Sequence, residues 1–479
     1  MKWDMVIGIE THAQLNTRTK LFCGCRTSFG DDPNVNTCPV CLGHPGVLPV
    51  FNIEARNKAV AAGLALNCRI NSMSQFDRKN YFYPDSPKAY QITQLFHPIC
   101  SDGHLTITVK KDNTVYNKTI RINRIHIEED AGKLKHAGAD ESHVDLNRAG
   151  TPLIEIVSEA DISSADEAVA YMQKLRSLFL YAGVSNCDME KGNFRGDVNL
   201  SLKPAGSKQW GNRTEIKNMN SFKSIHASII SEFKRQKKIL ENGKKIITET
   251  LLFDIEKQKT RPMRSKEEAH DYRYFPEPDL VPCHISNAEI KNIAASLPEL
   301  PDAKFKRFTE EYGLNSYDAG ILVADKHLAA YYEKAVAACR EQPKKICNWI
   351  LVEVNSYLNE NNLTITDFSL PAEHIGLLFQ EIGKGTINGK MAKEIFPEMI
   401  QSGHKPAAII KAKGLQQVTD DSLINSIIDT LLAENPDVVK QFKAGNTKVV
   451  GFFIGRVMKA TNGKANPKLV NQLLNHKLK

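Results

Sequence analysis

The chain has 479 residues, of which 42% are hydrophobic, and a formal net charge of +8 at pH 7. This length is enough for about three domains. No stretch approaches the roughly 18 apolar residues of a membrane span, and MKWDMVIGIETHAQL lacks the apolar core of a signal peptide. We therefore expect a cytoplasmic protein without membrane association, in which clustered cysteines are more commonly metal ligands than disulfides.

Residues 1–295 are predicted to form one large α+β domain around a mostly antiparallel sheet. Short segments rich in β-branched residues, such as MVIGIETHAQL and TPLIEIVSE, predict its strands. Two other segments, 164–182 and 221–242, have helical spacing. Each begins at a serine and is followed by a glycine, and these residues are typical helix caps.

Helical spacing prevails in the rest of the chain. We expect an all-helical domain over 296–405 and a small helical tail domain over 406–479. The expected tail helices lie around 421–433, 436–443 and 446–459 and after Pro467. Residues 401–479 contain twelve Lys or Arg and five Asp or Glu. This basic tail suggests a polyanionic partner such as nucleic acid, although charge alone favours a solvated surface equally.

Four of the ten cysteines form the pattern Cys23-x-Cys25, twelve residues, and Cys38-x-x-Cys41. Four thiolates in two close pairs suit a tetrahedral zinc ion, and closed sites of this kind are mostly structural. We therefore expect a structural Zn²⁺ that cross-links this loop. The alternative is a redox Cys-x-x-Cys that opens a helix. It is disfavoured because Pro39 follows Cys38 directly and further helix breakers come soon after.

Acidic residues accompany three of the predicted strands. Glu10 and His12 lie two apart on one strand, so they share a face with Cα atoms ~6.6 Å apart. Glu155 interrupts an apolar run, where a carboxylate needs a cation or a donor. The segment RIHIEEDAGKL supplies further acids. Together these residues are a candidate Mg²⁺ site, because Mg²⁺ prefers oxygen ligands. On spacing alone, unrelated surface acids and a core histidine are the more common outcome.

Two further segments combine polar and apolar residues. FDRKNYFYPD (76–85) mixes basic and aromatic residues, which suits a phosphate and a base; a solvated loop with aromatic anchors is the alternative. DVNLSL (197–202) places polar residues on one strand face, as an ordinary half-buried strand or a polar cavity wall would. The sequence has no P-loop, no GxGxxG after a strand, and no HExxH or GxSxG motif.

Several stretches together resemble the B subunit family of bacterial tRNA-dependent amidotransferases. The likeness spans the whole chain, in the order of the family's motifs. Its main stretches are VIGIETHAQLNTRTKLFCGC, CPVCLGHPGVLPVFN, FDRKNYFYPD, IHIEEDAGK, DLNRAGTPLIEIVSE, HDYRYFPEPDL, GKGTINGKMAKEIFP and GKANPKLVNQLL.

The resemblance implies an ATP-dependent carbon–nitrogen ligase with glutamine as amido donor. Such a complex converts misacylated Glu-tRNA(Gln) or Asp-tRNA(Asn) into Gln-tRNA(Gln) or Asn-tRNA(Asn). The B subunit phosphorylates the side-chain carboxylate with ATP, and ammonia then displaces the phosphate. The ammonia comes from glutamine hydrolysed by an amidase-like A subunit, and a small C subunit completes the heterotrimer.

The same resemblance implies roles for individual residues. The implied Mg²⁺ ligands are Glu10, His12, Glu129 and Glu155. Glu128 is an alternative to Glu129, because adjacent strand residues face opposite sides, but the matched motif favours Glu129. Glu10 is also an implied catalytic residue. Lys79 would bind ATP and stabilise transition-state charge, Glu155 would also contact the cofactor, and Asp197 would handle substrate or ammonia. The cysteines match the zinc-bearing members of the family.

The family's helical tail binds tRNA, which agrees with the basic charge of this tail. The implied phosphate contacts are Lys405, Lys411, Lys413, Lys440, Lys443 and Lys448. Two other functions compete with the ligase. A non-catalytic, zinc-containing tRNA-binding scaffold predicts tRNA binding without ATP turnover. A stand-alone metal-dependent ligase that uses free ammonia and a small acid predicts tRNA-independent ATP use, and it leaves the basic tail unexplained.

Overall fold

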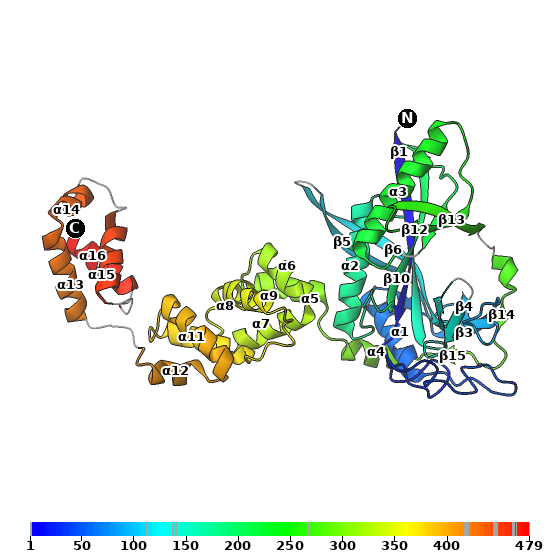
Figure 1. Ribbon diagram of the computed structural model, residues 1–479, viewed down its shortest axis with the longest axis horizontal. Coiled ribbons are helices and arrows are strands. Elements are labelled where there is room, and N and C mark those ends of the chain that lie inside the picture. Colours follow the sequence, from blue (N-terminus) through cyan, green and yellow to red (C-terminus); the bar gives the residue numbers. More distant parts are fainter. Residues whose placement is uncertain are drawn as a thin grey trace. The chain divides into compact units, whose positions relative to one another are not determined.

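The computed structural model in Figure 1 describes residues 2–111, 114–136, 138, 141–217, 219–265, 269–415, 421–443, 449–461, 465 and 467–478. The chain divides into two compact units, Met1–Pro301 and Asp302–Lys479. Among the described residues, no helix is both long enough and apolar enough to cross a membrane. The finer division into three domains stays a prediction.

The predicted α+β class is confirmed by the first unit, which is built on a large, mostly antiparallel sheet. Its strands run in the order β13-β12-β11-β10-β1-β9-β6-β5-β2, and β11 and β12 are the parallel pair. The strands are β1 (Trp3–Gln14), β2 (Arg69–Ile70), β5 (Cys100–Lys111), β6 (Thr114–Glu129), β9 (Pro152–Ser158), β10 (Phe194–Pro204), β11 (Thr214–Lys217), β12 (Glu249–Asp254) and β13 (Lys259–Ser265).

Helices cover one face of this sheet. They are α1 (Ile53–Ala65), α2 (Ala165–Ala182) and α3 (Phe222–Glu241), while α4 (Asn287–Ser296) packs against α1. Figure 1 shows α2 and α3 side by side along the sheet, and they contact each other, β5 and β10. The predicted caps are present: Ser164 and Ser221 each accept a backbone N–H at a helix start, and Gly183 ends α2 with φ +68°.

The strand β1 shows why the opposite face carries function. Ile7 and Ile9 are buried in the core under the helices, and Thr11 Oγ donates to the sulfur of Met172 in α2. Because side chains alternate along a strand, Glu10 and His12 point to the other face. The apolar residues therefore fix the phase of the strand and direct its polar residues away from the helices.

Smaller elements lie on that polar side. A second sheet consists of β3 (Met73–Asn80), β4 (Tyr90–His97), β14 (Phe275–Pro276) and β15 (Cys283–His284). Its strand β4 packs against β6 of the large sheet. A separate hairpin pairs β7 (Lys133–His136) with β8 (Ser142–Asp145), and a short 3₁₀ turn, η1 (Ala269–Tyr272), precedes β14.

The second unit is helical as described. Its elements are α5 (Pro301–Glu310), α6 (Ser316–Ala324), α7 (Lys326–Ala338), α8 (Pro343–Trp349), the π-helix η2 (Ile350–Val354), α9 (Asn355–Glu360), α10 (Ala372–Gly383), α11 (Gly389–Ser402), α12 (Pro406–Ala412), α13 (Asp421–Glu434), α14 (Pro436–Lys443), α15 (Val450–Ala460) and α16 (Pro467–Leu478). The last four match the helices expected in the tail. The predicted start of the third tail helix, residue 446, lies outside the described residues. The same holds for Lys448, one of the implied phosphate contacts.

Candidate active site

A row of polar side chains crosses four neighbouring strands on the face opposite α2. His12 of β1 lies opposite Arg195 of β10 on one side and opposite Glu155 of β9 on the other. Glu155 in turn lies opposite His126 of β6. Glu128 is two residues beyond His126 and shares its face. The sheet register therefore brings His12 next to residues more than a hundred positions away in the sequence.

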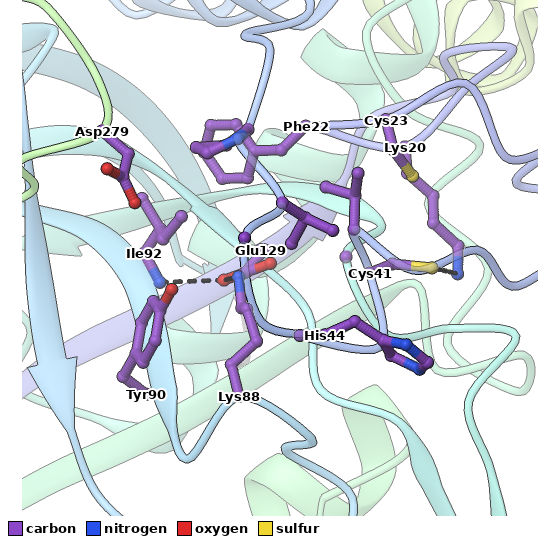
Figure 2. A pocket seen from close by; sticks show the side chains of 16 residues that line it. Lys20, Phe22, Cys23, Cys41, His44, Lys88, Tyr90, Ile92, Glu129 and Asp279 are labelled. Carbon is purple, nitrogen blue, oxygen red and sulfur yellow. Dashed lines mark hydrogen bonds and ion pairs between the residues drawn. The ribbon is translucent and has the colours of Figure 1, made fainter.

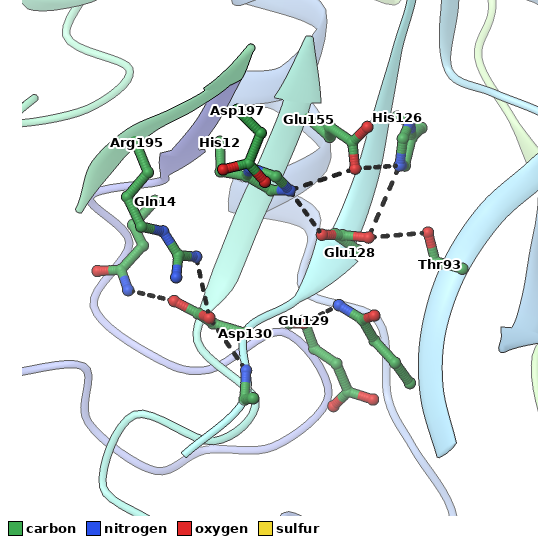
Figure 3. Close-up of polar contacts among 12 residues, drawn as sticks. His12, Gln14, Thr93, His126, Glu128, Glu129, Asp130, Glu155, Arg195 and Asp197 are labelled. Carbon is green, nitrogen blue, oxygen red and sulfur yellow. Dashed lines mark hydrogen bonds and ion pairs between the residues drawn. The ribbon is translucent and has the colours of Figure 1, made fainter. Parts of the chain in front are cut away.

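Four of these side chains form what we call the His–Glu cluster: His12, His126, Glu128 and Glu155. Figure 3 shows both imidazoles directed at the two carboxylates. His12 Nε2 lies 3.3 Å from Glu155 Oε2 and 3.7 Å from Glu128 Oε1. His126 Nε2 lies 3.4 Å from Glu155 and 3.6 Å from Glu128. Each carboxylate is thus shared between two imidazoles.

His126 and Glu128 are buried and His12 and Glu155 are half-buried, and the electrostatics of the cluster follow from that. Burial opposes charge on both imidazoles, but the neighbouring carboxylates outweigh it, so the pKa of His12 is raised and that of His126 rises to about 9. Burial likewise opposes charge on the carboxylates, yet the imidazoles lower the pKa of both Glu128 and Glu155. The site therefore keeps two carboxylates ionised inside the protein next to positive charge.

Three members of the cluster have the geometry of a cation site. One ligand atom each from His12, Glu128 and Glu155 lie within 4.8 Å of one another. Two carboxylates with one imidazole suit a divalent cation. Outer contacts hold these groups in place, since Thr93 Oγ1 donates to Glu128 at 3.1 Å and His126 contacts both carboxylates. The donor set therefore fits a divalent ion.

Glu129, which the predicted ligand set included, lies outside this cluster. Figure 2 shows its carboxylate in a separate cavity of ≈ 220 Å³, where it pairs with Lys88 and accepts the N–H of Ile92 at 2.9 Å. The reason is strand alternation: Glu128 shares the sheet face of His126, whereas Glu129 points to the other face. The structure therefore places Glu128, the alternative left open above, beside His12 and Glu155.

The predicted residues Glu10 and Asp197 lie one step along the same sheet face. They are opposite each other in the β1–β10 register. Glu10 accepts from Asn199 Nδ2 at 2.9 Å, and Asp197 pairs with Lys217 Nζ at 3.1 Å. Both carboxylates share the polar face with the cluster without entering the group of three ligand atoms around His12.

Lys79 of β3 stands apart from the cluster. Its Nζ lies 4.7 Å from the ring centre of Tyr272 and 5.6 Å from that of Tyr81. Burial, followed by the charge of Glu128, raises the pKa of Tyr81 and also of Tyr274, whose ring packs on Tyr272. Lys79 is therefore connected to the carboxylates through a group of tyrosines, with no direct ion pair to them among the described residues.

Two residues of the site were missed by the sequence analysis. His126 belongs to the cluster, and Arg124, two residues before it on β6, turns a buried Nε toward the same side without a hydrogen-bond partner among the described residues. The alternation of Arg124, His126 and Glu128 in RIHIEE was the available signal, because it marks one polar face.

The four predicted zinc ligands do come together. The Sγ atoms of Cys23, Cys25, Cys38 and Cys41 lie within 4.8 Å of one another. A hydrogen bond between Cys23 and Cys41 raises the pKa of the first thiol and lowers that of the second to about 4. Cys41 also accepts from the backbone N–H of Cys38 at 3.2 Å and lies 3.5 Å from Lys20 Nζ. Four crowded thiols of this kind fit a metal ion, with zinc the usual choice.

Comparison with known protein families agrees with this architecture. Residues 5–291 match the family described as the GatB/GatE catalytic domain, and residues 330–478 match the one described as the GatB domain. The chain belongs to the GatB family. The first match includes the His–Glu cluster and the four clustered cysteines, whereas the second includes the tail helices.

Full-length relatives support membership of the GatB family. The chain is 52% identical over 477 residues to the B subunit of the aspartyl/glutamyl-tRNA(Asn/Gln) amidotransferase of Brachyspira hyodysenteriae, covering 99% of both chains. It is 52% identical over 479 residues to the protein of the same name from Persephonella marina, and 53% identical over 482 residues to that of Geotalea uraniireducens, with 100% of both chains covered in each case. The family resemblance inferred from the sequence motifs is thereby confirmed.

Proposed function

We propose that this chain is the B subunit of a glutamine-dependent tRNA amidotransferase. It phosphorylates the side-chain carboxylate of Glu-tRNA(Gln) or Asp-tRNA(Asn) with ATP, and ammonia then displaces the phosphate to give the amide. The observation that carries this proposal is the His–Glu cluster on the polar sheet face, in a chain whose residues 5–291 match the GatB/GatE catalytic domain.

The chemistry of the reaction explains the need for such a cluster. A carboxylate and ATP are both anions, so their encounter requires compensation of charge. His12, Glu128 and Glu155 would hold Mg²⁺, which supplies positive charge for phosphoryl transfer. His126 would keep the two carboxylates oriented by its contacts with both. Asp197 would handle substrate or ammonia beside the cluster, and Glu10 would be a catalytic residue there.

Other parts of the assignment concern partners and the metal. We assign structural zinc to the four clustered cysteines. The relatives are named as B subunits, which supports a complex with an amidase-like A subunit and a small C subunit. This chain would receive its ammonia from the A subunit. The proposed substrate, an aminoacyl-tRNA, supports a cytoplasmic complex, and the basic tail supports tRNA binding with strong salt dependence.

The function is tested with the purified complex, labelled ATP, Mg²⁺ and misacylated tRNA. ADP is expected to form with Glu-tRNA(Gln) or Asp-tRNA(Asn) and not with the uncharged tRNA. Formation of amide is expected only when glutamine or ammonia is also present. Binding of tRNA without ADP would instead indicate the scaffold function, and ADP formation with a free small acid would indicate a stand-alone ligase.

Arg124 is expected to bind a phosphate of ATP. Its buried Nε has no partner among the described residues, and a guanidinium suits phosphate oxygens better than an ammonium does. Arg124→Ala should therefore raise KM for ATP about tenfold or more, and Arg124→Lys should recover only part of the loss. Exposed Arg69 of β2, which pairs with Asp102, provides the control variant Arg69→Ala, for which an unchanged KM is expected.

The two adjacent glutamates are expected to differ in metal binding. Glu128→Gln should weaken the binding of Mn²⁺, a spectroscopic substitute for Mg²⁺, by at least about tenfold. Glu129→Gln should leave it within about twofold, because that carboxylate pairs with Lys88 instead. Titration of each variant with Mn²⁺, followed by electron paramagnetic resonance, gives both affinities. The reverse order of effects would restore Glu129 as the ligand.

A further inference from the structure

A lysine at the end of β11, Lys217, lies on the polar sheet face and has no role in the function proposed so far. The register of β10 and β11 pairs Val198 with Ile216, and both of these side chains are buried in the core. Because side chains alternate along a strand, Asp197 and Lys217 point to the polar face beside each other. Lys217 is half-buried there, and its Nζ lies 3.1 Å from Asp197 Oδ2.

The charge of Lys217 is already used within the protein. Its Nζ also lies 3.5 Å from Glu215 Oε1, on the same face of β11. Glu215 is itself fixed by Thr250 of β12, whose Oγ1 donates to it at 2.9 Å. Burial opposes the charge of the ammonium group, but the carboxylates, Asp197 first, outweigh it, so the pKa of Lys217 is raised. Lys217 is therefore a fixed cation between two carboxylates, and a further anion is not needed to balance it.

Two carboxylates face each other next to this lysine. Glu10 of β1 lies opposite Asp197 in the sheet register, and like charges directly opposite on neighbouring strands repel each other. Each carboxylate has a donor of its own. Asn199 Nδ2 donates to Glu10 at 2.9 Å, and Lys217 donates to Asp197. The direction of the Asp197 carboxylate therefore depends on Lys217.

A second cation on the same strand face does not replace Lys217. Arg195 lies two residues before Asp197 on β10, but its guanidinium pairs with Asp130 at 3.2 Å. Among the described residues, Asp197 forms its ion pair with Lys217. Removal of the lysine would therefore leave Asp197 opposite Glu10 without the charge that holds it there.

The amidation step shows what a carboxylate fixed in this way can do. The lone pair of ammonia forms the carbon–nitrogen bond to the acyl phosphate, and the carbon–oxygen bond to the phosphate breaks. The phosphate leaves with that electron pair and takes up the proton that the nitrogen loses. Water competes for the same acyl phosphate and returns the free carboxylic acid. A carboxylate that accepts hydrogen bonds from ammonia and directs its lone pair favours the amide over hydrolysis, provided that its own position is fixed.

We propose that Lys217 is a positioning residue of the amidation step. It holds the Asp197 carboxylate beside Glu10, where that carboxylate orients ammonia toward the acyl phosphate. Lys217 itself contacts neither ATP nor the substrate. The proposal rests on the proposed function and deepens it, because it assigns Lys217 to the second half of the reaction and leaves phosphorylation to the His–Glu cluster.

The test measures ADP and amide in the same reaction, with the full complex, misacylated tRNA, ATP, and ammonium chloride in place of glutamine. Lys217→Met removes the charge and keeps the length of the side chain. It should lower the amount of amide formed per ADP about tenfold and raise KM for ammonia, while the rate of ADP formation stays within about threefold. The missing amide should be recovered as Glu-tRNA(Gln) or Asp-tRNA(Asn) and free phosphate.

The matched control is Lys118→Met. Lys118 of β6 is also a half-buried lysine on a strand, and it pairs with buried Glu167 of α2 at 2.7 Å, on the helix side of the sheet. Loss of that ion pair should leave the ratio of amide to ADP unchanged, whatever it does to stability. Lys217→Arg keeps the charge and should restore part of the ratio.

A double variant tests whether Lys217 acts through Asp197. In the background of Asp197→Asn, Lys217→Met should change the ratio of amide to ADP by less than about twofold, because residues that act as a unit do not have additive effects. Effects that multiply would overturn the proposal, since Lys217 would then act independently of Asp197. A ratio like that of the wild type in Lys217→Met would overturn it too.

An equal fall in ADP and amide would also overturn the proposal, because Lys217 would then serve phosphorylation or the fold. If Lys217→Met does not assemble into the complex, Lys217→Gln takes its place under the same criteria, since glutamine can still donate to Asp197 but carries no charge. Failure of the wild type to form ADP with misacylated tRNA would refute the proposed function itself, which is a separate outcome.

Discussion

Glu155→Gln is expected to lower ADP formation with misacylated tRNA by about a hundredfold or more. Glutamine keeps the size of the side chain and removes the charge that lies 3.3 Å from His12 and 3.4 Å from His126. If the cluster holds the cation, one ligand is lost, and the charge compensation that such an ion provides is worth several kcal/mol in the transition state. Single-turnover measurements with labelled ATP report the loss.

The matched control for this variant is Glu159→Gln. Glu159 follows β9, and its carboxylate accepts from Asn123 Nδ2 at 2.8 Å, away from the cluster. We expect it to form ADP at the rate of the wild type. Binding of tRNA should be unchanged in both variants, because neither removes a positive charge. Normal ADP formation by Glu155→Gln would make the cluster structural and move the chemistry elsewhere.

The faces of individual strands could be read from the sequence. In VIGIETHAQ the isoleucines alternate with Glu10 and His12. In the structure the isoleucines are buried under the helices, and the side chains of Glu10 and His12 point to the polar face. The sequence signals for helix caps are equally local, since Ser164 and Gly183 cap the two ends of α2 as expected. Such signals depend on neighbours within a few positions, which is why a single sequence contains them.

Pairings between distant strands could not be read in the same way. The contact of His12 with Glu128 depends on three strands in register and on the phase of β6. That phase changes at an irregularity between Ile122 and Arg124. Both Glu128 and Glu129 are buried, so hydrophobicity did not separate them. The position of Glu128 inside the cluster and of Glu129 outside it follows from tertiary structure.

Replacement of the second cysteine pair should have a large effect on stability. Cys38→Ser/Cys41→Ser removes half of the proposed zinc ligands, and metal binding at such a site contributes directly to folding. Many residues between Cys25 and Cys38 are exposed, so this loop has little core of its own. We expect the variant to lose its zinc, as measured by mass spectrometry. Its unfolding should begin at a temperature about 5–10 °C lower than that of the wild type. Limited proteolysis should cut first within this loop.

Cys283→Ser provides the control, because Cys283 lies on β15 and outside the cluster. It should retain zinc and the protease resistance of the loop. A zinc-free variant with normal stability would show that the cysteine cluster does not support the fold.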